Sequence, residues 1–168
     1  SYKDQEDSII NIYENSQENS NRLNRCFFCC NNNSSAKLKK AGYINQDRND
    51  IKRKLKDNSL IDVSNDIRRT EMWNKFSNYR FIIAPAGNGM DTHRLWEGLI
   101  LGCIVIVQST GLDKFMSEFP VVVVKDFNEI TEENLKKWHN KYSYMCNDNE
   151  IRKKYNSKYW LNIIRNSL

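Results

Sequence analysis

The sequence predicts an α/β protein with a parallel sheet, and three features lead to this prediction. The first is a series of short apolar runs that are nearly continuous rather than alternating, which is typical of strands buried on both faces. The second is the helix-like stretch that separates each run from the next. The third is the length of 168 residues, which suits one domain with a substantial core. This alternation predicts a doubly wound, Rossmann-like sheet of about five strands with helices on both faces.

The apolar runs are the predicted strands. They cover residues 26–30, 60–63, 81–84, 103–107 and 121–124.

The five cysteines, three of them crowded into CFFCC, do not fit a disulfide framework. Cys26 and Cys29 have CxxC spacing, but they lie in an apolar run. We therefore expect them to be buried strand residues rather than zinc ligands or a redox pair.

Periodicity and capping residues predict the helices. They cover residues 47–57, 70–78, 91–102, 111–118, 131–143 and 148–166, with a weaker pattern over 8–23. Thr131 is placed to cap the fifth of them, ahead of two glutamates in its first turn. No Pro-rich or Gly/Ser-rich linker interrupts the chain. We expect an N-terminal extension or helix over residues 1–24 and a Rossmann-like domain over 25–168 that includes the C-terminal helix.

Composition bears on partners and location. Lys and Arg number 26 against 21 Asp and Glu, and a net charge of +5 is too small to argue nucleic-acid binding. The basic stretch 36–56 is interrupted by Asn and Asp and lacks an aromatic array, so a solvated face is expected there rather than a nucleic-acid interface. No apolar run approaches the roughly 18 residues of a membrane span, and no secretory signal is visible. We expect a soluble segment, with a cytoplasmic location favoured by the free cysteines.

The predicted site follows the run at 81–84, because ligands of open parallel sheets bind at the carboxyl ends of strands. Gly87 and Gly89 flank Asn88 and allow the backbone to approach a ligand closely. Asp91 or Thr92 then caps a helix whose first N–H groups favour an anion. The segment is neither G-x-G-x-x-G nor a P-loop. It therefore predicts a phosphate site, but not one of the usual dinucleotide or NTPase type.

The start of this helix carries Arg94 and Glu97, three residues apart and hence on one face, beside His93. A guanidinium pairs bidentately with diphosphate oxygens, and a carboxylate can accept hydrogen bonds from two ribose hydroxyls. The pattern predicts a nucleoside-diphosphate site. The alternative is a surface Arg–Glu pair on an amphipathic helix, with His93 packed beside Trp96.

Two further segments lie at the same predicted edge of the sheet. Ser109 and Thr110 follow the run at 103–107 and could bond a phosphate or sugar hydroxyl, or could be ordinary turn residues before a glycine. The loop after the first run contains Asn31, Asn32, Ser34 and Ser35. It could contact the ligand, or it could be an Asn-rich loop without a function.

Residues 81–107 resemble the signature of exostosin-like glycosyltransferases. The shared features are an apolar strand, a turn with Pro and Gly, Asp-Thr-His-Arg, Trp-Glu, Gly-Cys and a second apolar strand. The resemblance continues to the helix after Thr131 and, more faintly, back to Arg48. It implies a GT-B enzyme, of which this chain would be the C-terminal, Rossmann-like half that binds a nucleotide-sugar.

The resemblance also implies roles for individual residues. Arg94 would meet the donor diphosphate and Glu97 the ribose, residues 87–89 would line the pocket floor, and Asp91 and His93 would border the sugar or diphosphate. Arg48 matches a family arginine that would add a second positive charge. The implied reaction is inverting and metal-independent, with no cofactor besides the donor. It moves a sugar, from a UDP-sugar by preference, to a hydroxyl of a glycan or glycoprotein.

Some features depart from the family pattern. Val105 stands where relatives often carry proline, and Ala84 and Ala86 stand where they often carry Ser or Glu. A GT-B enzyme has two Rossmann-like halves, and the acceptor half usually supplies the general base. We therefore expect the base to lie outside this chain, in an upstream half. The alternative is a non-catalytic binding or interaction module derived from such an enzyme.

Overall fold

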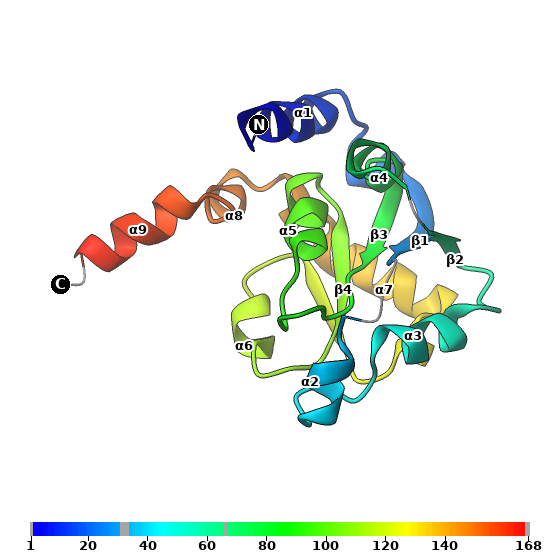
Figure 1. Ribbon diagram of the computed structural model, residues 1–168. Coiled ribbons are helices and arrows are strands. Elements are labelled where there is room, and N and C mark those ends of the chain that lie inside the picture. The colour runs from blue at the N-terminus through cyan, green and yellow to red at the C-terminus, as the bar shows by residue number, and fades with distance from the viewer. Residues whose placement is uncertain (1, 31–33, 66, 167–168) are drawn as a thin grey trace.

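The computed structural model describes residues 2–30, 34–65 and 67–166. Its centre is an all-parallel five-stranded sheet in the order β2-β1-β3-β4-β5 (Figure 1). The strands are β1 (Leu23–Cys29), β2 (Ile61–Ser64), β3 (Tyr79–Ile83), β4 (Ile104–Gln108) and β5 (Val121–Val124). The predicted α/β, Rossmann-like sheet is confirmed.

Helices cover both faces of the sheet. On one face lie α3 (Arg48–Leu55) and α7 (Glu132–Tyr142). On the other lie α1 (Tyr2–Glu14), α4 (Arg69–Phe76), α5 (His93–Ile100) and α6 (Asp113–Met116). The short α2 (Ala36–Lys40) follows β1, and α8 (Asn149–Lys153) and α9 (Ser157–Asn166) lead away from the sheet (Figure 1). Three 3₁₀ turns complete the described elements: η1 (Asn19–Asn21), η2 (Phe127–Glu129) and η3 (Ser143–Asn147).

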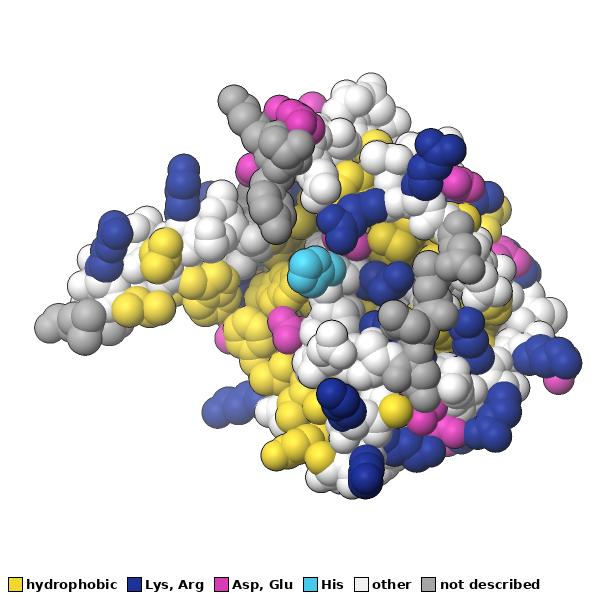
Figure 2. Space-filling view, in the orientation of Figure 1, with side chains coloured by type: hydrophobic (Ala, Val, Ile, Leu, Met, Phe, Trp, Pro, Cys, Tyr) yellow, Lys and Arg dark blue, Asp and Glu magenta, His cyan; other side chains and the backbone are white. Residues whose placement is uncertain are grey.

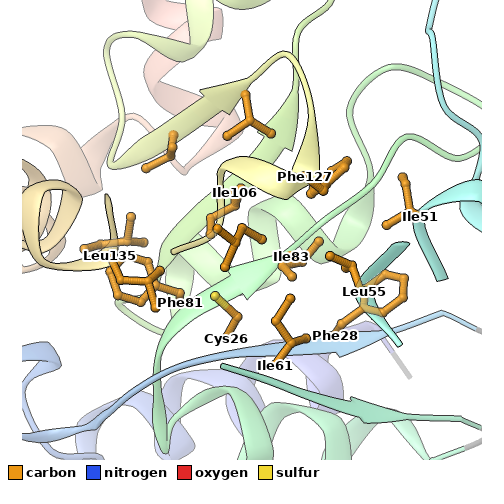
Figure 3. Packing of buried hydrophobic residues seen from close by; sticks show 14 of the residues in the cluster. Cys26, Phe28, Ile51, Leu55, Ile61, Phe81, Ile83, Ile106, Phe127 and Leu135 are labelled. Carbon is orange, nitrogen blue, oxygen red and sulfur yellow. The ribbon is translucent and has the colours of Figure 1, made fainter. Parts of the chain in front are cut away.

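The central strand β3 shows why the apolar runs are continuous. Phe81 and Ile83 belong to the cluster that α3 and α7 cover, whereas Ile82, between them, packs on the side of α1 and α4. Figure 3 shows the first of these clusters, in which Phe81 and Ile83 gather with Leu55 of α3 and Leu135 of α7. Because both faces of the sheet are covered at these three positions, the consecutive residues are all apolar.

Two predicted helices differ from the observed ones. The stretch predicted as one helix over 148–166 is divided into α8 and α9, because the Asn156 side chain accepts a hydrogen bond from the Lys158 backbone N–H at 2.9 Å and starts a new helix. The weak pattern over 8–23 is a helix only as far as Glu14, since the chain passes through η1 into β1. Thr131 caps α7 as predicted, accepting from the Asn134 backbone N–H at 3.2 Å.

All five cysteines are buried and free, so the prediction that Cys26 and Cys29 are core residues is confirmed. Burial raises the pKa of Cys103 to about 11 and that of Cys146 to about 12, and it also raises the pKa values of Cys26 and Cys30. Because the thiolate is the nucleophile, such thiols react slowly.

We therefore expect a disulfide reagent such as DTNB, at pH 8, to label the native protein very slowly and to label all five thiols once guanidinium unfolds it. The absorbance of the released thiolate measures both. Rapid labelling of any thiol in the native protein would contradict the burial of these side chains.

Candidate functional site

The winding of the chain reverses at β1, and this reversal places the site. From β1 the chain passes through α3 to β2, and from β2 it passes through α4 to β3 on the other side of β1. The connections that leave β1 and β3 therefore run to opposite faces of the sheet. Such divergence opens a crevice at the carboxyl ends of the two strands, which is where open α/β sheets bind ligands.

An open cavity of about 590 Å³ lies at this crevice, within the size range of small-molecule sites. Most of the predicted site residues line it, namely Arg48, Gly87, Asn88, Gly89, Asp91, His93 and Arg94. Ser34, Arg69, Thr92 and Trp96 also line it. Figure 2 shows this side of the molecule, where Lys and Arg side chains gather beside a histidine. The described lining thus contains three arginines, whereas Asp91 is its one acidic residue.

Arg48, the first residue of α3, is only 6% exposed. Its Nε donates a hydrogen bond to the Ala86 carbonyl at 3.0 Å, and its backbone N–H donates to Ser35 Oγ at 2.9 Å. Burial lowers the pKa of Arg48, and the positive charge of Arg94 lowers it further. Two cations that destabilise each other in a partly buried position would be stabilised by an anion between them.

Arg94, in the first turn of α5, supplies the second cation. Its Nε is buried and has no hydrogen-bond partner in the described part of the chain. The N-cap residue Thr92 makes no side-chain cap bond, and its Oγ1 is likewise buried without a partner among the described residues. In contrast, Asp47 caps α3 and Thr131 caps α7 through their side chains. The start of α5 therefore keeps donor capacity that the protein itself does not use.

Gly87 is needed because Arg48 approaches it closely. A Cβ at Gly87 would lie 2.8 Å from Arg48 Nη2 and 3.3 Å from Thr92 Cγ2. At Gly89 the nearest atom to a Cβ would be the Asp91 carbonyl oxygen at 3.4 Å, an ordinary contact. The Gly87 N–H donates to the Gly89 carbonyl at 3.0 Å and closes the turn. The glycine-rich segment thus makes room for the Arg48 guanidinium at the cavity wall.

The Glu97 side chain lies against Arg69 of α4, which is itself a residue of the cavity wall. Glu97 is absent from the described residues that line the cavity, and its side chain is 12% exposed. Its Oε1 lies 3.5 Å from Arg69 Nε, so the ion pair of Glu97 is with Arg69 and not the surface pair with Arg94 that the spacing allowed. Burial raises the pKa of Glu97, and Arg69 is the strongest influence in the opposite direction. Its contact with ribose remains a prediction.

Ser109 and Thr110 lie after β4, outside the described lining of the cavity. Ser109 Oγ donates to Asp113 Oδ2 at 2.6 Å, and the Thr110 N–H donates to Asp113 Oδ1 at 2.7 Å. Thr110 Oγ1 accepts from the Leu112 N–H at 3.1 Å. These are the bonds expected of turn residues that start α6.

The remaining candidates that the structure describes either line the cavity or support a residue that lines it. Asp91 is held by Trp96, whose Nε1 donates to Asp91 Oδ2 at 3.0 Å, while His93 is exposed at the cavity. Ser34 lines the cavity and Ser35 supports Arg48. Asn31 and Asn32 lie outside the described residues.

Three of the eight Lys and Arg residues in the basic stretch 36–56 form ion pairs. Lys39 and Arg53 form ion pairs with Asp50, and Lys54 pairs with Asp126. Fewer charges are then left to contact a nucleic-acid backbone.

Among the described residues, no group of three or more His, Cys, Asp or Glu is arranged to hold a metal ion. No described helix has the length and apolar character that crossing a bilayer requires.

Sequence reasoning missed Arg69 at the cavity. Arg69 begins α4, just after the carboxyl end of β2, and so lies at the same edge of the sheet as Arg48. The only available signal was its place after a predicted strand, which several charged residues share. Ser34 was considered as a candidate, and Trp96 lines the cavity while it also packs against Phe115 and Phe119.

The sequence was compared with protein-family models and with curated proteins, and nothing matches in either comparison.

Proposed function

We propose that this chain is the donor-binding domain of a glycosyltransferase, which moves a sugar from a nucleoside diphosphate to a hydroxyl of a glycan or glycoprotein. The observation that carries the proposal is the convergence of Arg48 and Arg94 on one cavity at the reversal of winding. Two guanidiniums can hold a diphosphate through forked hydrogen bonds. The resemblance of residues 81–107 to exostosin-like glycosyltransferases favours a nucleotide-sugar over other diphosphates.

The same geometry suits the chemistry of the transfer. As the bond between the anomeric carbon and the diphosphate breaks, negative charge grows on the departing oxygens. Arg48, Arg94 and the N-terminus of α5 would stabilise that charge from fixed positions. In an inverting reaction the acceptor hydroxyl attacks from the opposite face of the sugar and gives its proton to a base. That base would come from outside this chain, as the GT-B resemblance implies.

Isothermal titration with UDP, GDP and their sugars tests the proposal. We expect one UDP-containing ligand to bind per chain, with a Kd in the range of about 1 μM to 1 mM in which enzymes bind their substrates. ATP and orthophosphate serve as controls for a general affinity for anions. If none of the nucleoside diphosphates or their sugars binds, the proposal is wrong.

A second measurement separates an enzyme from a binding module. The UDP-sugar is incubated with a full-length protein that also contains the proposed acceptor half, with and without an oligosaccharide acceptor, and the release of UDP is followed. Release shows that the site supports cleavage of the donor. Tight binding without any release favours the non-catalytic module.

A further inference from the structure

Arg69 is a third guanidinium at the cavity, and it reaches the cavity from a different strand end. Arg48 follows β1 and Arg94 follows β3, whereas Arg69 follows β2. The Arg69 side chain is 47% exposed, unlike that of Arg48, whose residue is 6% exposed. It can therefore change its conformation without disturbing packed neighbours.

The contacts of Arg69 are of a kind that an anion could replace. Its Nε lies 3.5 Å from Glu97 Oε1, at the long limit for a hydrogen bond, and its Nη1 donates to Gln5 Oε1 at 2.9 Å. Partly exposed ion pairs contribute little stability. A phosphate group offers more charge and more acceptor oxygens than the single carboxylate does, so it would compete well for this guanidinium.

The ion pair matters more for the buried Glu97 carboxylate than for the partly exposed Arg69 guanidinium. The carboxylate is largely buried against α4, near Trp73 of that helix and near His93 and Arg94 of its own helix. Because Arg69 is its strongest positive neighbour, Glu97 would lose its main partner if the Arg69 guanidinium moved from the carboxylate to a phosphate in the cavity. Its oxygens would then be free to accept hydrogen bonds from hydroxyl groups of a ligand.

We propose that Arg69 is a third phosphate-binding residue, which in the empty site is held by Glu97 and which turns to the phosphates when a ligand binds. This inference deepens the proposed function and rests on it for the identity of the nucleotide. Phosphate binding and ribose binding are then linked, because the phosphates draw Arg69 away from the Glu97 carboxylate that is predicted to meet the ribose. A ligand that carries both phosphates and ribose would therefore bind more tightly than the separate affinities of pyrophosphate and the nucleoside suggest.

The test compares Arg69→Gln with Arg68→Gln, a matched change at the preceding, exposed residue that does not line the cavity. The probes are inorganic pyrophosphate, UDP and uridine, each titrated by calorimetry. Because Arg69→Gln removes a charged hydrogen-bond donor, the affinities for pyrophosphate and UDP should fall about 10- to 100-fold. Uridine should bind as before or more tightly, and Arg68→Gln should bind all three as the wild type does. Equal pyrophosphate affinity in Arg69→Gln and wild type would overturn the inference.

Glu97→Gln provides a second, independent readout. If Glu97 restrains Arg69, removing the carboxylate charge should tighten pyrophosphate binding several-fold in the wild type but not in the Arg69→Gln background, whereas a general effect of the lost charge would be the same in both. Unchanged or weaker pyrophosphate binding in Glu97→Gln would contradict the exchange of partners. Circular dichroism of each variant checks that the fold is kept, and Arg69→Lys, which keeps the charge, should lose less affinity than Arg69→Gln.

The two proposals fail in different ways. Arg69-dependent binding of pyrophosphate, with no binding of UDP, GDP or their sugars, would support the third cation and overturn the nucleotide-sugar site. Binding of UDP that is equal in wild type and Arg69→Gln would do the reverse. If no phosphate compound binds the wild type, both are wrong.

Discussion

Replacing Arg94 by alanine is expected to weaken UDP binding by about 100-fold or more, since a bidentate pair of charge-assisted hydrogen bonds would be lost. The expectation follows from the position of Arg94 at the cavity and from its buried Nε, which has no partner among the described residues. Isothermal titration of the variant against UDP measures the loss. Arg94→Lys keeps the charge but not the forked arrangement of donors, so its affinity for UDP should lie between that of the wild type and that of Arg94→Ala.

The same substitution should change the stability of the empty protein little. Alanine removes the repulsion between Arg94 and Arg48, and it also removes an attraction between Arg94 and the buried Glu97 carboxylate. A thermal melt without ligand, set beside the titration, separates a binding residue from a structural one. Arg53→Ala is the control, since Arg53 lies on the same helix as Arg48 and is ion-paired with Asp50 at the surface. If Arg94→Ala melted much lower and bound UDP normally, Arg94 would be structural.

Replacing Phe81 by alanine is expected to lower the free energy of unfolding by about 3–5 kcal/mol. Phe81 is fully buried in β3, beside Cys26 of β1 and Ile104 of β4, in the cluster that α7 covers with Leu135. Its removal would leave a cavity that a sheet paired on both sides cannot close. Domains are stable by only about 5–15 kcal/mol, so the variant would lose a large part of its stability.

Denaturation in guanidinium, followed by circular dichroism, measures this loss. Val63→Ala is the matched control, because Val63 lies on the edge strand β2 and is 46% exposed. Its effect should stay within about 0.5 kcal/mol, as is usual for surface positions. Comparable losses in the two variants would show that β3 is not the centre of the core.

The central parts of the strands could be predicted because both of their faces are covered, which favours apolar side chains. Ile82 and Phe81 face opposite covered sides of the sheet, so the run is apolar throughout. The start of β1 was missed because Leu23 is exposed and its pairing with Tyr79 involves backbone groups, which carry no sequence signal. The division between α8 and α9 depends on one local bond of Asn156, a weaker cue than the amphipathic pattern across it.

The site was predictable where it is local in sequence, and less so where it depends on the order of strands. The turn at 87–89 and Arg94 belong to one segment, and both line the cavity. Helical spacing placed Glu97 on the face of Arg94, but a contact with Arg69 of α4 draws its side chain to the neighbouring helix. Arg69 itself could not be assigned, since it reaches the cavity only because β2 pairs with β1.

The reversal of winding at β1 also couples occupancy of the cavity to folding of the whole sheet. The cavity walls come from segments that follow three different strands, so no single segment can bind the ligand before the sheet has formed. A ligand of the native state alone then stabilises the entire domain by mass action, by about 2.7 kcal/mol at a hundred times its Kd. The melting temperature of this chain should therefore rise when its ligand is added. A library of phosphorylated metabolites can be ranked by the rise that each compound causes, before any reaction is known.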